Sequence, residues 1–273
     1  MSMSVATSSD LKTRAKRFVK KLLNYSVASV TPSSVGSAPA PLLGDSLRKT
    51  VADFYLRGSG IEVGALHNPL QVPNWVTVQY VDRLSVPDLK QQYPELADLN
   101  LVEVDILDDG ERLTTIAAAS QDFVIANHFI EHCQDPIRAI ENALRVLKPG
   151  GILYMGVPDK RFTFDQHRAV TSIEHLLKDY HEGPEWSREL HFLDYAKFAS
   201  LGYTTAAEGQ DDPRIAAEAH RLMAMDYSIH FHVWTQAEIL ELLTVLQQQL
   251  QFPFDVELFV QNQEELIFIL KKN

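Results

Sequence analysis

Short apolar runs alternate with helix-like stretches from Asp45 to about residue 160. The run DFVIAN is continuous and apolar, as expected for a strand that is buried on both faces of a parallel sheet. Such alternation predicts right-handed crossovers and an α/β fold with a doubly wound, mostly parallel sheet. Strands are predicted at 60–64, 76–82, 101–107, 122–127 and 151–158, and helices at 45–56, 87–93, 111–119 and 136–147.

The last third of the chain has a different pattern. Residues 159–234 lack strand periodicity, so we predict a helical and loop insertion there. Thr235 begins an apolar helix and is followed three residues later by Glu238, which predicts a capping box. FDVELFVQ and EELIFILKK then form a predicted hairpin, joined at Asn262-Gln263. An antiparallel C-terminal hairpin would complete a seven-stranded sheet.

The first 44 residues form a separate predicted region, and residues 45–273 form the folded domain. Within 11–23, apolar residues recur at helical spacing while Lys and Arg fill the other face. This amphipathic helix could contact an anionic membrane surface or a protein partner weakly, or pack on its own domain. A Ser-, Pro- and Ala-rich linker follows it.

Composition narrows the class of protein. The net charge is −11 although residues 1–45 are basic, so the rest of the chain is strongly acidic and a nucleic-acid substrate is disfavoured. The single cysteine, Cys133, excludes an intramolecular disulfide or a cysteine-cluster metal site. We expect a cytoplasmic protein, possibly peripheral to a membrane.

Three acidic residues lie in or at the ends of predicted neighbouring strands: Glu62, Asp82 and Asp105. The carboxyl ends of strands in a doubly wound sheet line one crevice. A carboxylate about 20 residues after the first strand-to-helix turn can accept both ribose hydroxyls, which is the role expected for Asp82. Each acid alone could be a helix cap or a solvated turn residue. Together they favour a nucleoside pocket.

The sequence resembles the class I S-adenosylmethionine-dependent methyltransferases. The resemblance covers about residues 45–160, and the final hairpin matches the family's usual last two strands. The segments that carry it are IEVGA (61–65), YVDR (80–83), VDIL (104–107), DFVIANHFIEHCQDP (122–136) and RVLKPGGILYMGVPDK (145–160).

The resemblance implies S-adenosylmethionine as cofactor and a role for each matched position. It implies that Glu62, Gly64 and the adjacent Ala65 lie at the methionine end, and that Asp82, next to Arg83, binds the ribose. It further implies that Asp105 and Ile106 hold the adenine and that Asn127 and His128 border the methyl group. The family's next two glycines after Gly64 are replaced by Leu66 and a His67-Asn68-Pro69 turn.

Histidines and charged residues of the insertion are candidates for the acceptor site. In an extended chain His230 and His232 share one face, and they could act as general bases or as metal ligands, or one could be solvated and the other structural. His128 is a further candidate base. Asp159, Arg161 and His191 are predicted acceptor contacts, although Asp159 and Arg161 could equally belong to a surface ion-pair network.

The predicted activity is methyl transfer to an oxygen, or less readily a nitrogen, of a small polar acceptor such as a sugar or glycan. Alternatively, the chain could keep the fold and bind the cofactor as an accessory protein without catalysis. A remote alternative is a zinc hydrolase, because His128-Phe129-Ile130-Glu131-His132 matches H-x-x-E-H. No metal is assigned to the predicted site.

Overall fold

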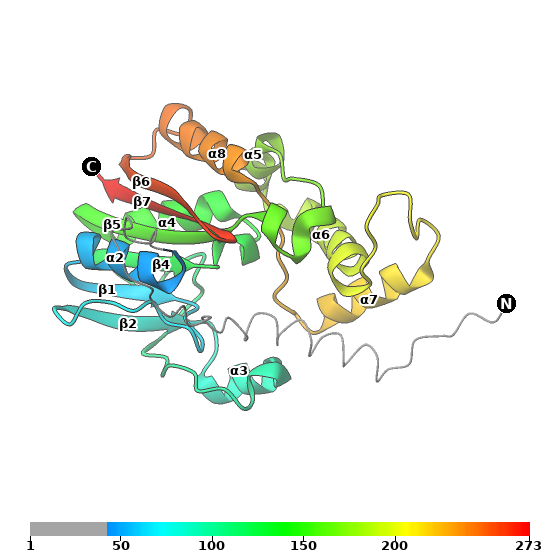
Figure 1. The fold of residues 1–273 in the computed structure, drawn as a ribbon, viewed down its shortest axis with the longest axis horizontal. Coiled ribbons are helices and arrows are strands. Elements are labelled where there is room, and N and C mark those ends of the chain that lie inside the picture. The colour runs from blue at the N-terminus through cyan, green and yellow to red at the C-terminus, as the bar shows by residue number, and fades with distance from the viewer. Residues whose placement is uncertain (1–42) are drawn as a thin grey trace, which may run out of the picture.

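A seven-stranded sheet forms the centre of the molecule in the computed structural model, which describes residues 43–273 (Figure 1). Its strand order is β3-β2-β1-β4-β5-β7-β6. The strands from β3 to β5 run parallel, and β7 is antiparallel to both β5 and β6. This confirms the predicted doubly wound sheet with a C-terminal hairpin. The predicted basic helix and linker lie outside the described residues.

The strands coincide closely with the apolar runs of the sequence. They are β1 (Gly58–Val63), β2 (Val76–Asp82), β3 (Ile106–Leu107), β4 (Gln121–Asn127), β5 (Leu147–Pro158), β6 (Phe254–Asn262) and β7 (Glu265–Lys272). The helices are α2 (Asp45–Tyr55), α3 (Val86–Gln92), α4 (Pro136–Val146), α5 (Ile173–Glu182), α6 (Arg188–Tyr195), α7 (Pro213–Ala224) and α8 (Gln236–Gln248).

Helices cover both faces of the sheet because its central strands are apolar on both sides. On β4, Phe123 and Ile125 pack with α2, whereas Val124 and Ala126 belong to the core formed with α4 and α8. Thr235 caps α8 and Glu238 completes the predicted capping box. Among residues 43–273, no helix has both the length and the apolar character needed to cross a bilayer.

Two sequence predictions on the β3 side of the sheet are wrong. The predicted strand 101–107 contracts to the two residues of β3, and the predicted helix 111–119 is a series of turns. The guanidinium of Arg145 explains the second difference, because it donates to the carbonyls of Leu113 (2.8 Å) and Ile116 (3.1 Å). These carbonyls are then occupied by a tertiary contact and do not form a helical ladder.

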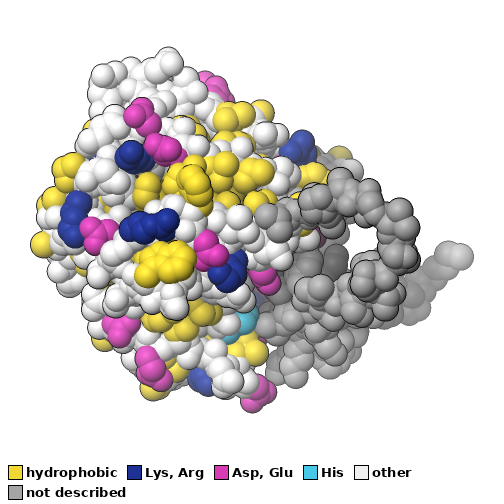
Figure 2. All heavy atoms as spheres, turned by 60° about the vertical axis from the view of Figure 1, so that its left-hand side comes forward, with side chains coloured by type: hydrophobic (Ala, Val, Ile, Leu, Met, Phe, Trp, Pro, Cys, Tyr) yellow, Lys and Arg dark blue, Asp and Glu magenta, His cyan; other side chains and the backbone are white. Residues whose placement is uncertain are grey.

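The segment between β5 and α8, residues 159–235, forms a cap at one end of the sheet. It contains α5, α6 and α7, with α6 and α7 extending away from the sheet edge (Figure 1). A separate small core holds it together, including Phe192, Leu222 and Phe231. The face on the opposite side of the molecule mixes acidic, basic and hydrophobic side chains (Figure 2).

Candidate active site

The carboxyl ends of β1, β2 and β4 meet at the middle of the sheet. Glu62 on β1 is in register with Tyr80 on β2 and Ile125 on β4. Asp82 ends β2 and Asn127 ends β4. The chain order reverses between β1 and β4, which is the switch point where ligands of doubly wound sheets bind.

Glu62 is a buried carboxylate with one oxygen unused. Its side chain is 2% exposed, and Oε1 accepts a hydrogen bond from the Leu70 N–H at 2.9 Å. Oε2 has no hydrogen-bond partner among the described residues. Burial raises the pKa of Glu62 to about 7, although the Leu70 N–H and the charge of Arg48 act in the opposite direction. Buried polar atoms normally have partners, so Oε2 is suited to a cationic group of a ligand.

The loop after β1 exposes its backbone beside this carboxylate. Gly64 has φ 65°, in the left-handed region that favours glycine, and a Cβ there would meet only a Phe129 carbon at 3.8 Å. The Ala65 carbonyl accepts from the Asn68 N–H at 3.0 Å, which forms the turn that replaces the missing glycines. The hydrogen bond from Leu70 then ties the end of this loop back to Glu62.

Asp82 is half-buried, and its Oδ1 accepts from the Leu84 N–H at 3.3 Å. Burial raises the pKa of Asp82, partly offset by hydrogen bonds from the Leu84 and Arg83 N–H groups and by the Arg83 charge. Asn127 lies across the same sheet end, and its Oδ1 has no hydrogen-bond partner among residues 43–273. These two residues and Glu62 fit a nucleoside with an attached amino acid.

Arg83 and Asp105 are not placed as predicted. The Arg83 guanidinium turns to Asp226 (2.8 Å) and the Tyr93 hydroxyl (2.8 Å), so it fastens the end of β2 to the cap instead of binding cofactor. Asp105 Oδ2 accepts from the Tyr80 N–H at 2.8 Å, which completes the edge of β2 where β3 is too short to do so. Ile106 packs partly buried against the core.

His128 is held between two carboxylates at the end of β4. Its Nε2 lies 3.0 Å from Glu265 Oε2, and its Nδ1 lies 3.5 Å from Glu131 Oε1. Burial lowers the pKa of His128, but hydrogen bonds to these carboxylates outweigh burial and raise it to about 9. His128 is therefore protonated at neutral pH, which contradicts the prediction that it could serve as a general base.

Glu265, the first residue of β7, binds three partners. It accepts two hydrogen bonds from Arg48 on α2 (2.7 and 2.5 Å), one from Asn262 (2.6 Å) and one from His128. Burial opposes its charge, yet the bonds from Arg48 and His128 lower the pKa of Glu265 to about 2. Sequence reasoning missed Arg48 and Glu265, because they come from opposite ends of the described chain.

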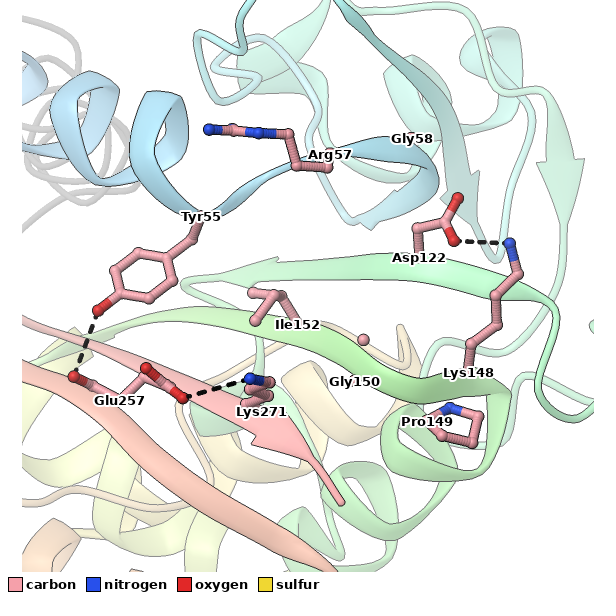
Figure 3. Close-up of a pocket in the computed structure, with 11 residues that line it drawn as sticks. Tyr55, Arg57, Gly58, Asp122, Lys148, Pro149, Gly150, Ile152, Glu257 and Lys271 are labelled. Carbon is pink, nitrogen blue, oxygen red and sulfur yellow. Dashed lines mark hydrogen bonds and ion pairs between the residues drawn. The ribbon is translucent and has the colours of Figure 1, made fainter.

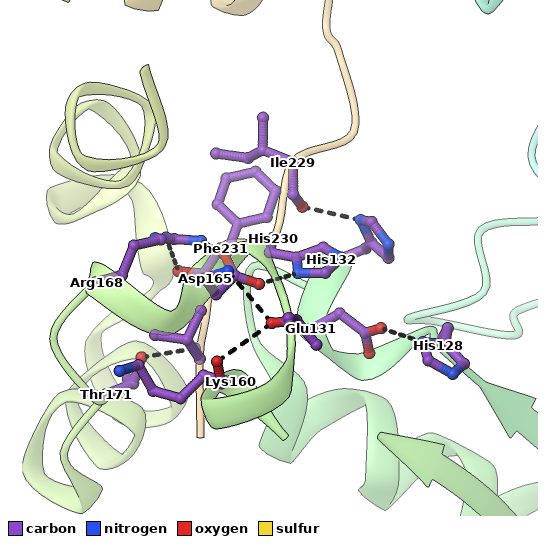
Figure 4. Close-up of polar contacts among 12 residues, drawn as sticks. His128, Glu131, His132, Lys160, Asp165, Arg168, Thr171, Ile229, His230 and Phe231 are labelled. Carbon is purple, nitrogen blue, oxygen red and sulfur yellow. Dashed lines mark hydrogen bonds and ion pairs between the residues drawn. The ribbon is translucent and has the colours of Figure 1, made fainter. Parts of the chain in front are cut away.

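His230 is paired with a buried carboxylate (Figure 4). Its Nδ1 lies 2.7 Å from Asp165 Oδ2, and Arg168 Nη1 donates to Asp165 Oδ1 at 2.8 Å. Burial raises the pKa of Asp165, but the charges of His230 and Arg168 and their hydrogen bonds hold it below its usual value. A carboxylate on Nδ1 fixes that nitrogen as the donor, so Nε2 is the acceptor in the neutral ring.

Three other predicted residues lie inside the cap. Asp159 is 0% exposed and forms an ion pair with Arg161, whose Nε and Nη2 lie 2.9 and 2.5 Å from the carboxylate oxygens. Asp159 is therefore engaged by Arg161 and does not present its carboxylate to an acceptor. His232 is also 0% exposed, and His191 Nε2 lies 3.0 Å from His175 Nε2, so both belong to a cluster of buried and half-buried histidines.

The H-x-x-E-H segment does not form the helix that a zinc peptidase requires. His128 has φ 49°, and only Ile130–His132 forms a short 3₁₀ turn. His132 Nδ1 donates to the Ile229 carbonyl at 2.9 Å and lies 3.0 Å from the Ser228 hydroxyl, away from the contacts of His128. The two histidines therefore do not share a site.

An open hollow of about 510 Å³ lies at the opposite end of the sheet (Figure 3). Its lining includes Gly58, Asp122 and Lys148, at the amino ends of β1, β4 and β5. Lys148 Nζ is paired with Asp122 Oδ1 at 2.6 Å across it. Because ligands of such sheets bind at the carboxyl ends, this hollow is not the cofactor site.

Comparisons with known proteins agree with this geometry. Residues 64–155 match the family model described as a methyltransferase domain. No curated protein sequence matches the chain.

Solved structures similar to the chain are distant in sequence. A possible histamine N-methyltransferase from Thermotoga maritima is 15% identical over 94% of this chain and 98% of its own, with TM-score 0.42. A putative S-adenosyl-L-methionine-dependent methyltransferase from Methanococcus maripaludis is 13% identical over 100% and 97%, with TM-score 0.43. The CurJ carbon methyltransferase is 13% identical over 79% of this chain, which spans about half (49%) of that one, with TM-score 0.40.

The strand order defines a doubly wound α/β protein, a fold in which ligands bind at the switch point of the sheet. The match to a methyltransferase domain at 64–155 covers the loop after β1, the strands β2, β3 and β4 and most of β5, about a third of the chain. The chain is identified as a methyltransferase that uses S-adenosylmethionine as its cofactor.

Proposed function

We propose that this enzyme methylates a hydroxyl oxygen of a small polar acceptor, such as a sugar or the end of a glycan. The observation that carries the proposal is the His230–Asp165 pair, because a hydroxyl must lose its proton to become a good nucleophile. The single buried Cys133 favours a cytoplasmic location.

Four residues at the carboxyl ends of the strands would hold the cofactor. The unpartnered Oε2 of Glu62 and the open backbone at Gly64 fit its amino-acid end, and Asp82 fits the ribose hydroxyls. Asn127, with its unpartnered Oδ1, borders the reacting end. When bound, S-adenosylmethionine supplies a methyl group activated by a positive sulfur.

His230 would act as the general base. Asp165 holds Nδ1–H, so Nε2 can accept the proton of an acceptor hydroxyl. The imidazolium formed in this step is stabilised by the Asp165 charge, which Arg168 keeps in place at 2.8 Å. The His230 side chain is 12% exposed, so the proton transfer would take place with little bulk water present.

Arg161 and Phe162, which follow β5, favour a polar acceptor that also has an apolar face. Phe162 is 51% exposed, and the guanidinium of Arg161 lies 5.3 Å from the centre of its ring. Aromatic rings and Arg donors side by side suit a sugar, which has both C–H faces and hydroxyl groups. Arg161 thus remains a proposed acceptor contact although Asp159 is closed.

A methyl-transfer assay tests the proposal. Labelled S-adenosylmethionine is incubated with panels of sugar and amine acceptors, and with a small-molecule extract, and the product is analysed by mass spectrometry. We expect an O-methyl product and a turnover about 10²–10⁴-fold lower in His230→Ala, the usual contribution of a general base.

His220→Ala is the matched control, because His220 is an exposed histidine of α7. S-adenosylhomocysteine affinity measured on each variant shows whether the cofactor site is intact. Unchanged turnover in His230→Ala with an N-methyl product would replace the proposal by amine methylation, since an amine can lose its proton before it binds.

A further inference from the structure

Four side chains from three segments of the cap converge at one point outside the proposed active site. His175 and Asp179 lie one helical turn apart on α5, His191 lies on α6, and His232 lies in the extended segment before α8. One nitrogen or oxygen of each lies within 4.8 Å of those of the other three. This is the histidine cluster named above, and we call it the cap cluster.

The distances within the cap cluster match those of ligands around one small cation. The Nε2 atoms of His175 and His191 are 3.0 Å apart, and Asp179 Oδ2 lies 3.2 Å from His175 Nε2 and 3.8 Å from His232 Nε2. Ligands about 2.0–2.2 Å from a tetrahedral zinc ion lie about 3.3–3.5 Å from one another. The three observed distances lie both below and above that range.

Hydrogen bonds alone do not satisfy these atoms. His175 Nε2 faces both His191 Nε2 and Asp179 Oδ2, but a ring nitrogen carries either one proton or one lone pair. If His175 Nε2–H donates to Asp179, the same nitrogen has no lone pair left to accept a hydrogen bond from His191. Asp179 Oδ2, on a side chain that is 0% exposed, has no hydrogen-bond partner among the described residues. A cation at the centre would satisfy the lone pairs of Asp179, His175 and His191, and His232 Nε2 would exchange its 3.3 Å contact with the Gln134 carbonyl for the ion.

The surroundings resemble those of a built ligand set. Ser187 Oγ donates to Asp179 Oδ1 at 3.1 Å, which orients the carboxylate so that Oδ2 points to the histidines.

We propose that the cap cluster binds one divalent transition-metal ion of the Zn²⁺ type through His175, Asp179, His191 and His232. Three imidazoles and one carboxylate suit zinc better than Mg²⁺ or Ca²⁺, which prefer oxygen ligands. Four protein ligands fill a tetrahedral shell, so the ion is structural: it joins α5, α6 and the segment before α8. The proposal does not depend on which acceptor the enzyme methylates.

Metal binding by the full chain, prepared without a histidine tag, tests the proposal. The protein is stripped with a chelator, titrated with Zn²⁺ alone by calorimetry, and then loaded with Co²⁺ for absorption spectroscopy. We expect about one ion per chain, a Co²⁺ spectrum of a four-coordinate site, and a thermal midpoint that rises with free Zn²⁺, as ligand linkage requires. All ten histidines of the chain lie in the described part, so each can be tested.

Matched variants locate the ion. His191→Ala and Asp179→Asn are expected to lose the stoichiometric ion, because each removes one ligand. His181→Ala, an exposed histidine of α5, and His132→Ala, from the neighbouring Glu131–His132–His230 group, are expected to retain it.

Two results would overturn the proposal, and neither requires a variant that may fail to fold. The first is a wild-type protein that takes up no Zn²⁺ at micromolar concentrations after stripping. The second is a Co²⁺ spectrum without four-coordinate character. Retention of the ion at full affinity in folded His191→Ala would also refute it, by placing the ion elsewhere.

Discussion

The carboxyl edge of the sheet and the cap cluster both bury carboxylates with histidines, but they leave the histidines in opposite states. At the sheet edge, His128 lies between Glu131 and Glu265, and its pKa rises to about 9. In the cap cluster, three histidines share one carboxylate, and the pKa of His191 falls to about 4. Two carboxylates face one histidine at the sheet edge, whereas three histidines face one carboxylate in the cap cluster.

The His230–Asp165 pair differs from both. One histidine there has one carboxylate, which Arg168 also neutralises. The three arrangements lie close together in space, since residues 229–234 contact both the cap and the end of β4.

Glu265→Ala is expected to have the largest effect on stability. It leaves Arg48 and His128 without their buried partner, and breaking a buried pair costs about 3–5 kcal/mol of unfolding free energy. The measurement is denaturant unfolding at pH 7. Asp53→Ala is the control, because the exposed Lys49–Asp53 pair on α2 should be worth at most about 0.5 kcal/mol. Equal effects of the two substitutions would contradict the conclusion that Glu265 stabilises the charges of Arg48 and His128.

Asp165→Asn should reduce turnover without loosening the cofactor. The amide can still accept from Nδ1–H but cannot stabilise the imidazolium, so we expect kcat to fall about 10²-fold or more. S-adenosylhomocysteine affinity should stay the same, since Asp165 lies in the cap and not at the strand ends. A kcat within a factor of two of the wild type would show that His230 functions without the negative charge of Asp165.

The smallest predicted effect is a pH dependence of cofactor binding. Glu62, with a pKa of about 7, is mostly protonated at pH 6 and mostly ionised at pH 8. Because only the carboxylate attracts the cofactor's ammonium group, the Kd for S-adenosylhomocysteine should fall about tenfold over this range. Calorimetry at several pH values measures it. Glu62→Gln should bind more weakly and with a flat profile over the same interval; a wild-type slope that persists in this variant would assign it to another group.

The sequence by itself determined the sheet and the sheet edge at which the carboxyl ends of the parallel strands meet. A continuous apolar run such as DFVIAN has to be buried on both faces, and parallel strands place their ends together. From this followed the positions of Glu62, Asp82 and Asn127. The capping box at Thr235 and the hairpin were equally readable, because both are local signals.

Only the tertiary structure decided how the charged groups pair. The helix expected at 111–119 does not form, because the Arg145 guanidinium binds carbonyl groups of this segment. Arg83 does not point to the predicted cofactor site, because it pairs with Asp226, which is 143 residues later in the chain. The cap cluster joins His175 to His232 across three segments, and no local pattern specifies that meeting. Local signals fix elements because their causes lie within a few residues, whereas pairing depends on distances that exist only after the elements pack.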